Sequence, residues 1–197
     1  MWKAFVFGVI VSGTVGPIAL LIFGTGARQG LAAGSVAAFG AVFADFLYAL
    51  AAFLLGALIL PFLAGNRFAI DVGCALLLMG FGAWMAVAQL RPGPPPEAPR
   101  PAARLFLPTF LLTFLNPMTL VIFAGFVPQL PVAGSLGMAA VLALALAAGS
   151  AAVGVGFAGA GAAIGKAMPG ERGRRAISLA TAAGIFAFGV YGLVGAL

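Results

Sequence analysis

The chain has 197 residues, of which 63% are hydrophobic and 7% are charged, and its formal net charge is +6. A soluble globular domain carries about 25% charged residues, so this chain has too few polar side chains to cover a water-facing surface. The composition excludes a soluble domain and predicts an all-α protein that spans the lipid bilayer.

Six apolar stretches are long enough to cross a hydrocarbon core of about 30 Å, which takes about 20 helical residues. They cover residues 4–24, 32–60, 68–90, 105–127, 134–164 and 176–197. The first stretch is too long for a signal peptide, and no small-residue cleavage site follows it before Arg28. We therefore expect it to be retained, so that residues 1–197 form one transmembrane domain of six helices.

A proline-rich segment separates two groups of three spans. This segment, 91–104, is expected to be an extended, solvated linker between the halves 1–90 and 105–197. Placing both termini outside puts eight basic residues inside: Arg28, Arg91, Arg100, Arg104, Lys166, Arg172, Arg174 and Arg175. Only Lys3 and Arg67 are then outside. The positive-inside rule therefore predicts a multi-pass protein of the cell inner membrane with both termini outside and a cytoplasmic linker.

The basic residues lie in short connections between apolar stretches. Such a distribution indicates loops that face anionic lipid, and it argues against a groove for nucleic acid. The expected partners are therefore the lipid bilayer and a small molecule, with no nucleic acid.

The two halves share a proline motif at an offset of 100 residues. Residues 16–23 read Gly-Pro-Ile-Ala-Leu-Leu-Ile-Phe, and residues 116–123 read Asn-Pro-Met-Thr-Leu-Val-Ile-Phe. Weaker echoes pair Gly34-Ser35 with Gly134-Ser135, and Phe81-Gly82-Ala83-Trp84 with Phe188-Gly189-Val190-Tyr191. Because each half has three spans, an odd number, the halves must lie in opposite orientations. This inverted repeat is a plan common among secondary transporters.

Pro17 and Pro117 each lie about a dozen residues into their spans, close to the bilayer midplane. Proline inside a helix removes a hydrogen bond and clashes with the preceding turn, at a cost of about 3 kcal/mol. The freed backbone groups must face protein or a polar cavity. We expect the two breaks, with Gly16 and Asn116 beside them, to supply backbone groups for a substrate. The alternative is a pair of kinks without a binding role.

Asp45 is the charged residue that lies deep inside a predicted span. An ionised side chain at the centre of a membrane helix costs about 2.5–3.5 kcal/mol, and burial without a basic partner favours the protonated form. Asp45 is expected to carry a proton in antiport or to bind the amino group of a substrate. The alternative is a protonated side chain that is hydrogen-bonded within the bundle. By offset alone, Asp45 corresponds to Ala145, so the acid is not duplicated.

Other polar side chains lie at a similar depth. Tyr48, close to one turn from Asp45, could hydrogen-bond to it from the same helix face. Further polar groups are Thr14, Thr113, Asn116 and Thr119. Ser and Thr often bond back to their own helix in lipid, so each Thr alone favours a structural role.

Three motifs together resemble the lysine exporter (LysE) family, which includes the homoserine/threonine exporters. They are Gly13-Thr14-Val15-Gly16-Pro17, the stretch from Gly40 to Asp45, and Phe114-Leu115-Asn116-Pro117. The resemblance covers the whole chain in length and span layout. It implies export of amino acids or related solutes driven by the proton gradient. Two positions depart from the family pattern: Val15 stands where a proline is typical, and Met118 stands where a lysine is frequent.

Several other functions are excluded or stay open. Histidine is absent, so a Ser–His dyad and a histidine zinc site are excluded, and an aspartyl dyad would need a second Asp at depth. We therefore expect no enzyme, no cofactor and no metal site. A cation or metal exporter of the same fold stays open, although the spans offer only Cys74 and Asp45 as ligands. A membrane assembly protein that transports nothing also stays open, as do the substrate and a homo-oligomeric state.

Overall fold

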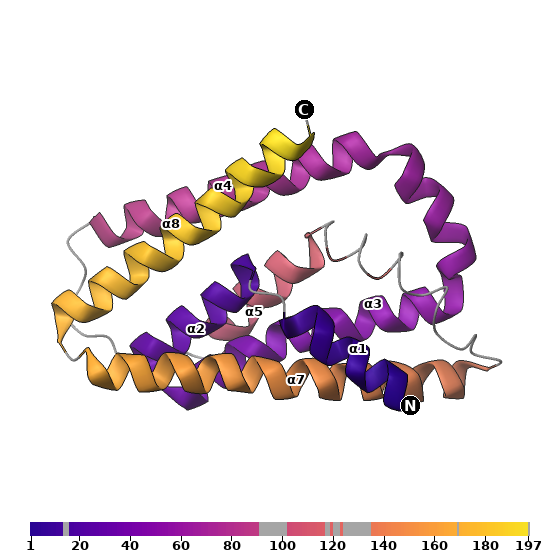
Figure 1. Ribbon diagram of the computed structural model, residues 1–197, viewed down its shortest axis with the longest axis horizontal. Helices are drawn as coiled ribbons and strands as arrows, with labels where there is room; N and C mark the ends of the chain where they lie inside the picture. Colours follow the sequence, from indigo (N-terminus) through magenta and orange to yellow (C-terminus); the bar gives the residue numbers. More distant parts are fainter. Residues whose placement is uncertain are drawn as a thin grey trace.

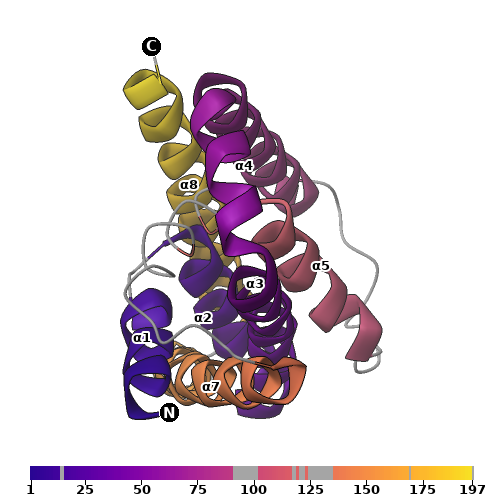
Figure 2. The ribbon, with the colours of Figure 1, turned by 90° about the vertical axis from the view of Figure 1, so that its right-hand side faces the viewer.

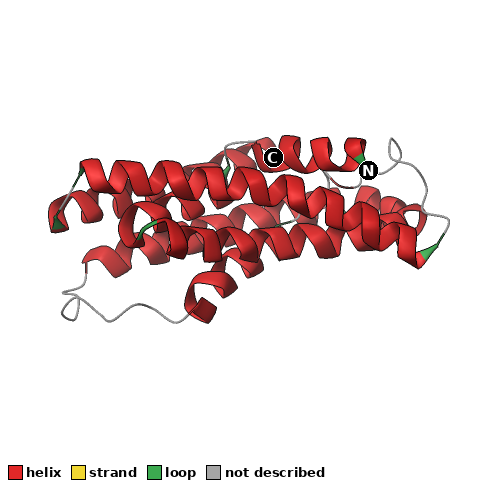
Figure 3. Ribbon diagram, turned by 90° about the horizontal axis from the view of Figure 1, so that it is seen from below, coloured by secondary structure: helices red, strands yellow, loops and turns green. Residues whose placement is uncertain are grey.

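The computed structural model describes residues 1–13, 16–90, 102–116, 119, 123, 135–168 and 170–196. Within these residues the regular structure is entirely helical, as Figure 3 shows, which confirms the predicted all-α class. The helices are α1 (Trp2–Gly13), α2 (Pro17–Gln29), α3 (Leu31–Gly65), α4 (Arg67–Leu90), α5 (Ala102–Phe114), α7 (Leu136–Ala167) and α8 (Glu171–Ala196).

Four of these helices contain a segment long and apolar enough to cross a membrane. The segments are Leu31–Leu54, Phe68–Ala88, Leu136–Ala167 and Glu171–Ala196. The bent pair α1 and α2 passes the same test as one span, which raises the number to five. The fourth predicted span, 105–127, begins within α5 and continues into residues that are mostly outside the described part. Six spans therefore stay a prediction.

The helices pack as two pairs that are joined by shorter helices. α4 packs along α8, and α3 packs along α7 (Figure 1). The helix α2 contacts α3, α7 and α8 and so connects the two pairs. α1 lies against α7, while α5 lies against α3 on the other side of the molecule (Figure 2). Except where α2 meets α3, each of these pairings joins a helix of residues 1–90 to one of residues 102–196.

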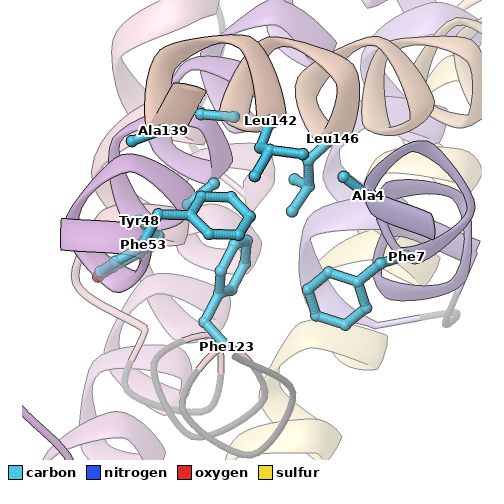
Figure 4. Packing of buried hydrophobic residues seen from close by; sticks show 10 residues of the cluster. Ala4, Phe7, Tyr48, Phe53, Phe123, Ala139, Leu142 and Leu146 are labelled. Atoms are coloured by element: carbon cyan, nitrogen blue, oxygen red, sulfur yellow. The ribbon is translucent and has the colours of Figure 1, made fainter. Parts of the chain in front are cut away.

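A cluster of aromatic and aliphatic side chains fills the space where α1, α3 and α7 meet. Phe7 of α1 and Tyr48 of α3 point toward Phe123, with Leu142 and Leu146 of α7 beside them (Figure 4). The ring of Phe123 lies 5.6 Å from that of Phe7, edge to face, and 5.8 Å from that of Tyr48. Phe123 is thereby anchored between helices that come from both halves of the chain.

Glycines set how closely α1 and α7 approach. A Cβ atom on Gly149 would overlap the carbonyl oxygen of Phe5, and one on Gly8 would overlap that of Leu146. Since lipid tails are as apolar as leucine, helix association in a membrane depends on such close backbone packing. Gly8 and Gly149 thus allow the close packing of α1 on α7.

Two predicted connections are shorter than expected. The spans predicted at 4–24 and 32–60 leave a connection at 25–31, but α2 continues to Gln29 and ends at Gly30, whose φ of 88° favours glycine. Residues 24–27 are buried, and Arg28 donates from Nε to the carbonyl of Gly24 at 3.0 Å. Burial and this bond at the helix end favour the helical conformation over a loop. Likewise, the break expected at 61–67 reduces to a turn at Asn66.

The close contact of α1 with α7 predicts a difference between two glycine substitutions. Gly149→Ala places a methyl group on the carbonyl of Phe5, and we expect the free energy of unfolding to fall by about 1–3 kcal/mol. Gly156→Ala is the control on the same helix, because nothing lies within 4 Å of a Cβ there. It should match the wild type or gain up to about 1 kcal/mol from helix propensity. Thermal unfolding of the purified protein in detergent measures both, and equal stability of the two variants would contradict the close contact.

Candidate functional site

The helix break predicted at Pro17 is present. α1 ends at Gly13 and α2 begins at Pro17, and the two helix axes differ in direction by 76°. Gly16 is the N-cap of α2 in an extended conformation and has no side chain to cap the helix. Pro17 occupies the first helical turn, where the missing N–H needs no partner. Thr14, a predicted site residue, and Val15 lie outside the described residues.

A second interruption follows α5. The helix ends at Phe114, and the backbone N–H of Asn116 donates to the carbonyl of Thr113 at 3.2 Å. The side chain of Asn116 is buried, and its Oδ1 accepts a hydrogen bond from Sγ of Cys74 at 2.8 Å. Asn116 is therefore held against α4. Pro117 and Met118 lie outside the described residues.

Asp45 lies on α3 and is 5% exposed. The Oγ of Ser12 donates to its Oδ2 at 3.5 Å, and the side chain of Ser150 lies close enough to interact with this carboxyl group. Ser150 Oγ in turn lies 3.5 Å from the carbonyl oxygen of Gly8, to which it donates. The acid is thus surrounded by polar groups from α1 and α7, and these three helices meet at its carboxyl group.

These contacts respond to the protonation state of Asp45. A protonated carboxyl group can donate to the hydroxyl of Ser150, which then donates to the carbonyl of Gly8. An ionised carboxylate only accepts, so Ser12 and Ser150 could both donate to it, and Ser150 would then no longer donate to the carbonyl of Gly8. One proton on Asp45 therefore changes how α1 is bonded to α3 and α7.

Tyr48 does not bond to Asp45, contrary to the prediction. Its hydroxyl donates to the carbonyl of Phe114, and its ring stacks on the ring of Phe114 at 5.4 Å. The last carbonyls of a helix lack partners within the helix, so the end of α5 offers an acceptor that Tyr48 satisfies. Tyr48 thereby connects α3 to the residue that ends α5.

One turn of α3 thus contacts residues beside both helix breaks. Asp45 bonds to Ser12, which is next to the last residue of α1, and Tyr48 bonds to Phe114, the last residue of α5. A shift at either break would have to change one of these two contacts. The contacts of Asp45 and Tyr48 therefore join α3 to the end of α1 and to the end of α5, whereas the side-chain bond of Asn116 is to Cys74 of α4.

Three functional candidates were missed in the sequence: Ser12, Ser150 and Cys74. Ser150 had a detectable signal, because it is the one side chain with a hydroxyl in residues 136–165. The partners of Ser12 and Cys74 lie 33 and 42 residues away, and no local pattern reveals them. The structural role expected of Thr113 is confirmed, since its hydroxyl donates to the carbonyl of Thr109 on its own helix at 2.8 Å.

Comparison with known proteins supplies one match. The family model of the LysE type translocator matches residues 9–195, a range that includes both helix breaks and Asp45. No curated protein and no solved structure matches the chain. Within the described residues, no group of three or more His, Cys, Asp or Glu side chains is placed to hold a metal ion.

The bond between Tyr48 and Phe114 can be tested with the two tyrosines of the chain. Tyr48→Phe keeps the stacked ring but leaves the carbonyl of Phe114 without this donor, so we expect a loss of about 0.5–1.5 kcal/mol in unfolding free energy. Tyr191→Phe is the matched control, because Tyr191 is 80% exposed and should change stability by less than about 0.5 kcal/mol. Thermal unfolding in detergent compares them. If both variants unfold at the same temperature as the wild type, the hydroxyl of Tyr48 has no role in holding α5.

Proposed function

The chain belongs to the LysE type translocator family, and from this premise we propose that it is a secondary transporter that exports amino acids or related small metabolites in exchange for protons. Family membership and the four apolar helices of membrane-spanning length support a multi-pass membrane transporter. The exported substrate class and the exchange with protons are our proposal. The observation that carries it is the buried carboxyl group of Asp45, bonded to Ser12 beside the break between α1 and α2.

The break between α1 and α2 is our proposed substrate site. The N-terminus of α2 carries the positive end of the helix dipole, and Gly16 leaves its first N–H groups without a side-chain cap. These groups suit a substrate carboxylate. The C-terminus of α1 and Asp45 have the opposite charge and suit an amino group or a proton. An amino acid matches both ends of the break. Asn116, which is buried beside the second interruption, is proposed to face the same substrate path.

Coupling would run through the bonds of Asp45. Protonation from the outside would remove the negative charge, and the bonding of Ser12 and Ser150 would change as described above. Because these serines belong to α1 and α7, the change would favour one arrangement of α1 against the other helices. A ligand shifts a conformational equilibrium only by binding its states differently, and the charge of Asp45 provides such a difference.

An inverted repeat of six spans is part of the proposal, and helix packing supports it. α1 packs on α7 as α5 packs on α3, and α3 packs on α7 and α4 on α8, the helices that an inverted repeat would pair as equivalents. Gly40 approaches the carbonyl of Phe106 as Gly149 approaches that of Phe5. Asp45 follows Gly40 by five residues, and the fifth residue after Gly149 is Gly154. The acid therefore has no counterpart in the second half by this correspondence either.

Export is tested with vesicles that contain the purified protein and are preloaded with each of a panel of amino acids. An inward proton gradient should accelerate efflux of at least one of them. Asp45→Asn keeps the size of the side chain but cannot release a proton, so efflux should fall by about tenfold or more, equivalent to about 1.4 kcal/mol. Asp71→Asn, at the start of α4, should retain the wild-type rate.

Two results would contradict the proposal. Efflux from protein-containing vesicles no faster than from protein-free vesicles, for every amino acid, would remove the export function. Export by Asp45→Asn at the full rate, with the same response to the gradient, would leave export intact but remove the proton role of Asp45.

The orientation of the chain is tested with reporter fusions at either terminus and within the linker 91–104. A reporter active only outside the inner membrane should work at both termini and fail in the linker, since the basic residues favour a cytoplasmic linker. A reporter active only in the cytoplasm should give the reverse pattern. A cytoplasmic signal from either terminus would disprove the six-span topology.

A further inference from the structure

More oxygen atoms surround the carboxyl group of Asp45 than the binding of a proton needs. Besides the carboxylate, they are the hydroxyls of Ser12 and Ser150 and the carbonyl of Gly8. We propose that, with Asp45 ionised, these four groups form a binding site for a sodium ion. The inference rests on the proposed coupling role of Asp45 and names a second ion that the same carboxylate would hold.

The donor set suits a hard monovalent cation. All four groups are oxygens, which Na⁺ and other hard cations prefer, and none is a sulfur or an imidazole. Asp45 supplies a single negative charge, which balances Na⁺ but leaves a divalent ion with an excess charge in a buried place. Asp45 and Ser150 are 5% and 1% exposed, so the ion would be held away from bulk water.

The spacing of the oxygens also fits an ion. Ser12 Oγ lies 3.5 Å from Asp45 Oδ2, and Ser150 Oγ lies 3.5 Å from the oxygen of Gly8. An ordinary O–H···O hydrogen bond is about 2.7–2.8 Å long. Calcium, whose radius is close to that of sodium, binds oxygens at about 2.3–2.6 Å, so two ligands at a right angle stand about 3.3–3.7 Å apart. Each of the two separations falls in the range for neighbouring ligands of one cation.

The end of α1 adds to the attraction. Ser12 is next to the last residue of α1, where the helix dipole contributes about half a negative charge. The last carbonyls of a helix have no partner within it, and an ion at this helix end would be attracted to them as well. In transporters, the C-terminal ends of interrupted helices are common places for coupling cations.

The local packing keeps the four groups together. Gly8 faces the backbone of Leu146 and Ser150 so closely that a Cβ atom on it would overlap the carbonyl of Leu146. A larger residue at this position would move Ser150 away from α1. The glycine contact therefore sets the distance between the α1 and α7 ligands.

Binding of radioactive sodium to the purified wild-type chain in detergent, without substrate and at one fixed pH, tests the proposal. We expect saturable binding that NaCl displaces and equimolar KCl does not. Ser150→Ala and Asp45→Asn should each lower the affinity by about tenfold or more, the loss that removal of even a supporting partner causes at protein metal sites. Ser35→Ala, which removes a hydroxyl elsewhere on α3, is the matched control and should bind as the wild type does.

Ser→Ala changes remove one oxygen with little change in volume, so Ser12→Ala and Ser150→Ala keep the test valid if Asp45→Asn fails to fold. Ser12→Thr should restore the binding that Ser12→Ala loses. Absence of saturable binding, equal displacement by KCl, or wild-type affinity in both serine variants would overturn the proposal. Because no substrate is present, a chain that exports amino acids but binds no Na⁺ would contradict this inference alone. A chain that binds Na⁺ but exports nothing would instead contradict the proposed function.

Discussion

The buried carboxyl group of Asp45 needs hydrogen-bonding partners, and the surrounding helices supply them. A charged or polar group inside a membrane protein must be paired or hydrogen-bonded, because lipid supplies no partner. Here the partners are hydroxyls that come from α1 and α7, helices far apart in the sequence. Those helices can bring the hydroxyls close only because Gly8 and Gly149 let the two backbones touch. The close glycine packing of α1 on α7 is therefore what allows the buried acid to find its hydrogen-bonding partners.

The same turn of α3 joins the two interruptions of the helical structure. Asp45 holds the end of α1 through a side-chain contact, and Tyr48 holds the end of α5 through a backbone carbonyl. In the proposed mechanism the substrate path and the ion site move together, and one turn of α3 that contacts residues beside both breaks would link them. Cys74 adds a third contact, from α4 to Asn116.

Packing between helices of the first half and helices of the second half holds the two helix breaks in place. α1 rests on α7, α5 rests on α3, and the pairs α3–α7 and α4–α8 cross between the halves. α1 and α5 each pack mainly on a long helix of the opposite half. The helices beside the breaks are thus held by helices from the opposite half, so a movement of either half would shift these contacts.

The sequence by itself determined the helical membrane class, the family, the break at Gly16–Pro17 and the burial of Asp45. Each of these follows from local chemistry: apolar length, a proline without an N–H, or an acid without a nearby base. Only the tertiary structure decided that Ser12 and Ser150 meet Asp45, that Tyr48 turns to Phe114, and that α2 continues through Arg28. These features depend on which helices pack together. In an apolar chain, helix faces differ little in composition, so close contacts between small residues select the neighbours, and local sequence patterns do not encode them.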